Sequence, residues 1–204
     1  MLTKKKIIIF DLDGVLINSI KNMEASWKRT SPKFGIKKTF LDYRKYLGLP
    51  FEVILKNLKI KKNHTKIKKC YNDFSNKFFN KIRIYPNVKK TLEILKKKKF
   101  ILAVITSKDY SRTKKILKRF NLKFKYVLCP NKKIRPKPYP DQILKILNKE
   151  KIEKKNCFYV GDMKIDKKFA KKAKVNFIYA NYGYGEKINS RLKINRINDL
   201  TKII

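Results

Sequence analysis

The chain has 204 residues, of which 43% are hydrophobic and 12% aromatic, so it has enough apolar material for a compact core. Its 6 glycines and 7 prolines exclude collagen-like and linker-like chains, and its 3 scattered cysteines exclude a zinc ribbon or a disulfide framework. The net charge is +40, and lysines carry most of it along the whole length. This distribution favours a diffuse lysine-rich surface over a dedicated nucleic-acid face, although non-specific association with polyanions is expected.

The sequence predicts a soluble protein of the cytoplasm with no membrane partner. No apolar run approaches the roughly 20 residues that a membrane span needs. The basic start is followed by a short apolar run that stops at Asp11, too early for a signal peptide. The sequence contains no pattern that predicts the oligomeric state.

Five short runs of apolar residues have the composition of buried strands. They are rich in β-branched and aromatic residues, and they are apolar at consecutive positions, as expected where helices cover both faces of a parallel sheet. The runs are Lys6–Phe10, Phe100–Thr106, Tyr126–Cys129, Cys157–Val160 and Val175–Ala180.

Segments with helical spacing separate these runs, and this alternation predicts an α/β fold with a doubly wound, Rossmann-like parallel sheet. Residues 15–84 interrupt the alternation, because they carry helical spacing and no strand signal. A single crossover does not need so many residues. We therefore expect an α/β core formed by residues 1–14 and 85–204, with residues 15–84 inserted as a helical subdomain.

Two carboxylates follow the first predicted strand. Asp11 and Asp13 lie two residues apart, a spacing that puts both side chains on the same side of an extended chain, and Gly14 then suits a tight turn. Because open α/β sheets bind ligands at the carboxyl ends of their strands, we expect a site here.

Other polar residues reach the same edge from later strands. Thr106 and Ser107 end one strand, and Asp162 directly follows another, with Asp166 at the start of the next helix. Lys137 lies in a Lys-Pro-Tyr-Pro segment, whose prolines stiffen the loop. The sequence thus predicts carboxylates, hydroxyls and one ammonium around a single rim, where the backbone N–H groups of a helix start could bind phosphate.

Together these motifs resemble those of the haloacid dehalogenase-like hydrolase superfamily, most of whose members are Mg²⁺-dependent phosphatases. The motifs occur in the family order, the helical insertion falls at the position of the family's cap, and the tail resembles phosphoglycolate phosphatase-like members. The segments that carry the resemblance are residues 10–14 (FDLDG), Thr106-Ser107, Lys137-Pro138, residues 161–166 (GDMKID) and Gly183-Tyr184-Gly185.

The resemblance implies roles for the residues around the reacting phosphoryl group. Asp11 is the nucleophile that forms an aspartyl-phosphate, and Asp13 is the general acid and base. Thr106, the backbone of Ser107 and the ammonium of Lys137 hold the phosphoryl oxygens, and Lys137 also neutralises charge.

The resemblance also implies a Mg²⁺ cofactor. Its ligands would be the side chains of Asp11 and Asp162 and the backbone carbonyl of Asp13, since Mg²⁺ prefers oxygen ligands. Asp166 would support the metal's waters or Lys137.

The expected reaction is hydrolysis of a small phosphorylated metabolite, phosphoglycolate-like or sugar-phosphate-like. Val15 and Asn18 stand where many phosphatases of the family have Thr and Asp, and Val15 also occurs in the branch that includes phosphosugar mutases. A phosphosugar mutase is therefore one alternative. An alternative of another class is a polyanion-binding or nucleic-acid-binding protein on a retained hydrolase scaffold, which the charge would suit.

Overall fold

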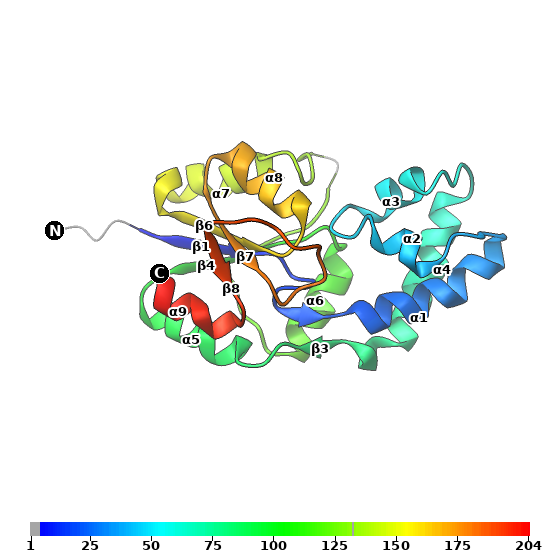
Figure 1. The fold of residues 1–204 in the computed structure, drawn as a ribbon, viewed down its shortest axis with the longest axis horizontal. Helices are drawn as coiled ribbons and strands as arrows, with labels where there is room; N and C mark the ends of the chain where they lie inside the picture. The colour runs from blue at the N-terminus through cyan, green and yellow to red at the C-terminus, as the bar shows by residue number, and fades with distance from the viewer. Residues whose placement is uncertain (1–4, 132) are drawn as a thin grey trace.

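The computed structural model describes residues 5–131 and 133–204, and its centre is a parallel β-sheet (Figure 1). Within these residues the sheet has six strands in the order β5-β4-β1-β6-β7-β8, and every neighbouring pair is parallel. The strands are β1 (Ile7–Phe10), β4 (Ile101–Ile105), β5 (Tyr126–Leu128), β6 (Cys157–Gly161), β7 (Asn176–Ala180) and β8 (Leu192–Ile194).

Helices cover both faces of the sheet, which explains why its strands are apolar at consecutive positions. On one face, Ile8 and Phe10 pack with α5, α6 and α9, and on the other, Ile7 and Ile9 pack with α7 and α8. These helices are α5 (Val88–Lys97), α6 (Tyr110–Arg119), α7 (Asp141–Glu150), α8 (Lys164–Ala173) and α9 (Leu200–Ile203). The α/β class and the doubly wound sheet predicted from the sequence are confirmed.

Four further helices lie beyond the carboxyl ends of the strands and form a body of their own (Figure 1). They pack around a separate apolar cluster that includes Trp27, Tyr43 and Tyr71. A short antiparallel pair, β2 (Ile17–Asn18) with β3 (Arg83–Ile84), joins this body to the sheet. The helices are α1 (Ile20–Thr30), α2 (Phe40–Arg44), α3 (Phe51–Asn57) and α4 (His64–Lys77).

The structure differs from the sequence-based expectation at three short strands. The pair β2 and β3 lies in a region expected to be wholly helical, and β8 was not expected at all. Each strand has two or three residues, too few to give a periodic signal, and each forms because a neighbouring strand offers hydrogen-bonding groups. Among the described residues, no helix has both the length and the apolar character needed to cross a membrane.

A buried amide joins α1 to α4. The Nδ2 atom of Asn22 donates to the carbonyl oxygens of Ser75 and Phe78, each at 2.9 Å, and its Oδ1 atom accepts from the Ser75 hydroxyl at 2.6 Å. Asn22 is fully buried. A buried amide satisfied on both sides fixes the relative position of the two helices, because any displacement would leave polar groups unpaired.

Replacing Asn22 with Ala should lower the free energy of unfolding by about 1–3 kcal/mol, since the Ser75 hydroxyl would lose its buried acceptor and the carbonyls of Ser75 and Phe78 would each lose a donor. Urea denaturation measures this loss. The matched control is Asn76→Ala, at an exposed position of α4, which should change stability by less than about 0.5 kcal/mol. Equal losses in the two variants would contradict the structural role of the buried amide.

Candidate active site

The order of the strands brings the predicted site residues to one rim. β1 lies between β4 and β6, and Phe10 is in register with Val104 on one side and Val160 on the other. Asp11 therefore leaves the sheet beside the carboxyl ends of both neighbours, close to Thr106 and Asp162.

Lys137 forms the centre of the site. Its Nζ atom lies 2.8 Å from Oδ1 of Asp11 and 2.9 Å from Oδ1 of Asp166, and all three side chains are nearly inaccessible to solvent. Asp166 also accepts hydrogen bonds from the Tyr159 hydroxyl at 3.1 Å and from the Met163 backbone N–H at 3.1 Å. Asp166 is thus held by several donors and in turn holds the lysine.

Asp162 is enclosed by backbone. Its Oδ2 atom accepts from the backbone N–H of Tyr184 at 2.7 Å, and its Oδ1 atom has no hydrogen-bond partner among the described residues. A Cβ atom added at Gly14 or at Gly183 would lie 2.2 Å from an atom of the Asp162 side chain. Glycines at these positions therefore make room for the carboxylate.

The carboxylate cluster fits a divalent cation. One oxygen from each of Asp11, Asp162 and Asp166 lies within 4.8 Å of the others, and all three residues are buried. Three carboxylates against the one ammonium of Lys137 leave two negative charges uncompensated, and burying such charges is very costly. The unpaired Oδ1 atom of Asp162 is an oxygen donor of the kind that hard divalent ions take.

Burial perturbs the acid–base properties of the cluster. Desolvation raises the pKa of Asp11 from 3.8 to about 7, against the opposing effect of Lys137 and with a further increase from Asp166. Desolvation also raises the pKa of Asp162 well above its ordinary value, reinforced by Asp166 and Asp11. Burial lowers the pKa of Lys137, but Asp11 and Asp166 outweigh it and raise the pKa overall. A cation among these carboxylates would favour their ionised forms.

Asp13 lies at the edge of the cluster and has partners that the sequence did not indicate. Its Oδ1 atom accepts from the Ser19 hydroxyl, and its Oδ2 atom lies 3.2 Å from Nζ of Lys108. The Tyr184 hydroxyl in turn accepts from the Ser19 backbone N–H and lies 3.1 Å from the Ile17 carbonyl oxygen. No motif marks Ser19 or Lys108 in the sequence, and the segment that contains Tyr184 did not indicate this contact, because it depends on the paths of separate loops.

Thr106 and Ser107 occupy the end of β4 as predicted, but their side chains have different partners. The Thr106 hydroxyl accepts from the Lys108 backbone N–H at 3.2 Å. The Ser107 hydroxyl donates to the carbonyl oxygen of Gly48, at 2.5 Å, in the helical body. Ser107 therefore connects the rim of the sheet to the helices that face it.

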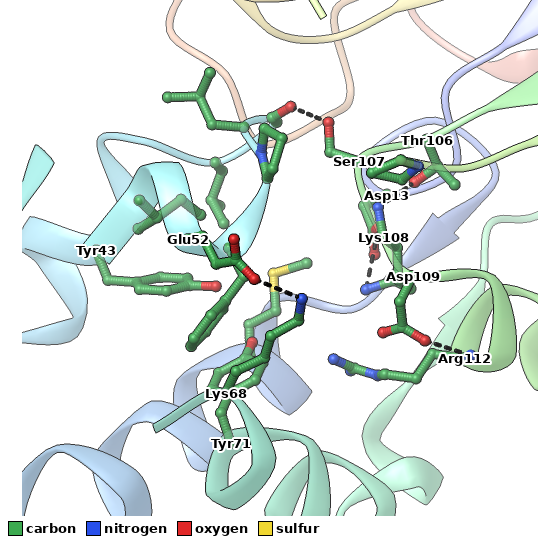
Figure 2. A pocket seen from close by; sticks show the side chains of 18 of the residues that line it. Asp13, Tyr43, Glu52, Lys68, Tyr71, Thr106, Ser107, Lys108, Asp109 and Arg112 are labelled. Carbon is green, nitrogen blue, oxygen red and sulfur yellow. Dashed lines mark hydrogen bonds and ion pairs between the residues drawn. The ribbon is translucent and has the colours of Figure 1, made fainter. Parts of the chain in front are cut away.

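A pocket of about 430 Å³ lies between this rim and the helical body. Figure 2 shows its two sides, with Tyr43 and Tyr71 on the helical side and Asp13 and Lys108 on the side of the sheet. Asp11 is among the residues that line it. Its carboxylate therefore borders a partly enclosed space large enough for a small metabolite.

The chain is similar in sequence and in structure to known proteins. The family model described as haloacid dehalogenase-like hydrolase matches residues 8–180. The chain is 31% identical to a phosphoglycolate phosphatase of Aquifex aeolicus over 98% of this chain and 96% of that protein. It is 25% identical to a phosphorylated carbohydrates phosphatase of Thermotoga maritima over 84% of this chain and 83% of that protein.

A solved structure agrees over the full length. The crystal structure of a predicted phosphoglycolate phosphatase from Haemophilus somnus superposes with a TM-score of 0.84, at 25% identity, over 100% of this chain and 99% of that one. The similarity therefore includes the helical body as well as the sheet.

The metal-free protein should lose stability as the pH rises from about 4 to about 7. In this window Asp11 is ionised in the unfolded chain but still protonated in the folded one, so the folded state binds more protons and is progressively disfavoured. The raised pKa of Asp162 acts in the same direction. Urea denaturation in excess chelator at several pH values measures the trend.

Two controls identify the cause of this loss of stability. A divalent cation should remove most of the loss, because it compensates the ionised carboxylates. Asp11→Asn should make the metal-free protein more stable than the parent at pH 8 and leave it nearly unchanged at pH 4. A metal-free stability that rises between pH 4 and pH 7 would contradict this description of the cluster.

Proposed function

The chain belongs to the haloacid dehalogenase-like hydrolase family and is a phosphatase, and we propose that it uses Mg²⁺ to hydrolyse a small phosphorylated metabolite, phosphoglycolate-like or sugar-phosphate-like. One observation carries the proposal. Asp11 is held at 2.8 Å from Lys137 inside a cluster of three carboxylates, and it lines a pocket of about 430 Å³.

In the proposed reaction Asp11 attacks phosphorus. A bond forms between its carboxylate oxygen and the phosphoryl group while the bond from phosphorus to the leaving oxygen breaks. Asp13 gives a proton to that oxygen and then takes a proton from the water that hydrolyses the aspartyl-phosphate. Ser19 supports this role because its hydroxyl donates to one oxygen of Asp13 and fixes the orientation of the carboxylate.

The phosphoryl oxygens need positive charge and hydrogen-bond donors. Lys137 supplies a buried ammonium, and the Thr106 hydroxyl and the backbone N–H of Ser107 lie at the carboxyl end of the neighbouring strand. These groups act in a site shielded from water, where their interactions are stronger than in solvent.

The proposed metal ligands are the side chains of Asp11 and Asp162 and the backbone carbonyl of Asp13. When bound, Mg²⁺ would compensate the charge of the carboxylates and of the phosphoryl group. Asp166 would support the metal's waters while it holds Lys137 at 2.9 Å.

The helical body contributes the other wall of the pocket. We propose that residues 15–84 form a cap on a core of residues 1–14 and 85–204. Because the cap lines the pocket, it would exclude water from the intermediate and limit the size of the substrate. A phosphosugar mutase would share the core, and it would transfer the phosphoryl group from Asp11 to a second sugar hydroxyl instead of to water.

Assays of phosphate release from a panel of phosphorylated metabolites, with Mg²⁺ and with chelator, test the proposal. A phosphatase releases free phosphate in proportion to substrate consumed, and chelation should abolish this release. Conversion of a sugar phosphate to its isomer with little free phosphate would favour the mutase, and full activity in excess chelator would contradict the role of the metal.

Asp11→Asn should reduce kcat by several orders of magnitude while the fold persists, because the amide has the shape of the carboxylate without its nucleophilic charge. Steady-state phosphate release measures the loss, and circular dichroism checks the fold. Asp73→Asn, at an exposed position of α4, is a matched control that should retain parental activity. Near-parental turnover in a folded Asp11→Asn protein would exclude the covalent mechanism.

A further inference from the structure

Two cations line the pocket beyond the reacting carboxylates, and the reaction at phosphorus does not use them. Lys108 precedes α6 and Arg112 lies in its first turn, and both line the pocket on the side of the sheet (Figure 2). Among the described residues, the pocket wall has one other cation, Lys68, which is 40% exposed and pairs with Glu52 at 3.0 Å. Lys68 is therefore already neutralised at the solvent edge.

Lys108 lies where a leaving group would be. The proton donor Asp13 must contact the leaving oxygen, and Nζ of Lys108 is 3.2 Å from Oδ2 of Asp13. The side chain of Lys108 is only 7% exposed, and burial lowers its pKa although Asp13 opposes this effect. A substituent attached one or two carbons from the leaving oxygen would thus meet a desolvated ammonium.

Arg112 is held in place by the helical body. Its Nη1 atom donates to Oδ1 of Asn72 at 3.0 Å, and its Nη2 atom donates to the Ser75 hydroxyl. The guanidinium also lies over the ring of Tyr71, 5.7 Å from its centroid. These two hydrogen bonds use only part of a group that has five N–H donors, so a preorganised guanidinium can still donate to a ligand in the pocket.

We propose that Lys108 and Arg112 form an anion subsite for the leaving group, so that the enzyme prefers phosphate esters whose leaving alcohol carries a second negative charge. The inference rests on the proposed phosphatase function and narrows its substrate class. A carboxylate or a second phosphate would supply the charge. A neutral hydroxyl would leave the desolvated ammonium of Lys108 without an anionic partner on the leaving group, and such mismatches in a buried polar site are strongly discriminated against.

Three small esters that differ in one group test the proposal. They are 2-phosphoglycolate, with a carboxylate, ethylene glycol bisphosphate, with a second phosphate, and 2-hydroxyethyl phosphate, with a neutral hydroxyl. The measured quantity is the ratio of kcat/KM for each charged ester to that for the neutral ester. The parent should prefer at least one charged ester by about 10- to 100-fold, the range expected for a charge-assisted hydrogen bond.

Lys108→Met and Arg112→Gln should each lower that ratio by about tenfold or more, and the double variant should bring it close to one. This ratio of kcat/KM values distinguishes a role of Lys108 and Arg112 in specificity from a purely structural role. Damage to Asp13 or to the cap would lower kcat/KM for all three esters alike and leave the ratio unchanged. Lys108→Arg keeps the charge and should retain most of the preference. Lys115→Met, at an exposed position of the same helix, is the matched control and should keep the parental ratio.

The outcomes distinguish this inference from the function on which it rests. A ratio near one in the parent, or a ratio unchanged in the folded Lys108→Met and Arg112→Gln proteins, would overturn the anion subsite and leave the phosphatase intact. The absence of phosphate release from all three esters and from the wider panel would overturn the proposed function itself. The ratio of kcat/KM should fall more for one of the two charged esters than for the other in these variants. That difference shows whether the subsite selects a carboxylate or a phosphate.

Discussion

Three carboxylates buried around a single ammonium impose the constraint on which the rest of this molecule depends. Within the described part of the chain, Lys137 is the only cation in contact with the desolvated cluster of Asp11, Asp162 and Asp166, so the three carboxylates cannot all be charged without further positive charge. A divalent ion would supply that charge. The electrostatic imbalance that is expected to weaken the metal-free protein would therefore favour binding of the proposed metal.

The fold supplies the rigidity that such a cluster requires. Parallel strands buried on both faces place their carboxyl ends at one rim, and the backbone there is fixed by neighbours on each side. The helical body completes the site because it contacts Ser107 and Arg112 and lines the pocket, and the buried amide of Asn22 keeps two of its helices in register.

The sequence predicted the sheet and the residues at its rim because both depend on local patterns. Continuous apolar runs identify buried strands. The residues that directly follow such a strand lie at the rim of the sheet, whatever the orientation of their side chains. Asp11, Asp162, Asp166 and Lys137 lie together as their positions at strand ends and in a stiffened loop suggested. Asp13 and Thr106 also lie on this rim and line the pocket.

The contacts between loops could not be predicted in the same way. Ser19 and Lys108 contact Asp13 directly, and Tyr184 contacts Ser19, through interactions whose geometry depends on tertiary packing. Among so many lysines, Lys108 had no feature that distinguished it from its neighbours. The short strand β8 was missed for a related reason, because three residues pair only when β7 is already in place.

The enclosure of Asp162 has a consequence for the order in which the protein becomes active during synthesis. Asp11 and Gly14 leave the ribosome early, but Gly183 and the N–H of Tyr184, which contact Asp162, are made some 170 residues later. A nascent chain can form β1, β4 and β6 and still lack the backbone that orients this carboxylate. The surroundings of Asp162 are therefore complete only after this last loop has been synthesised.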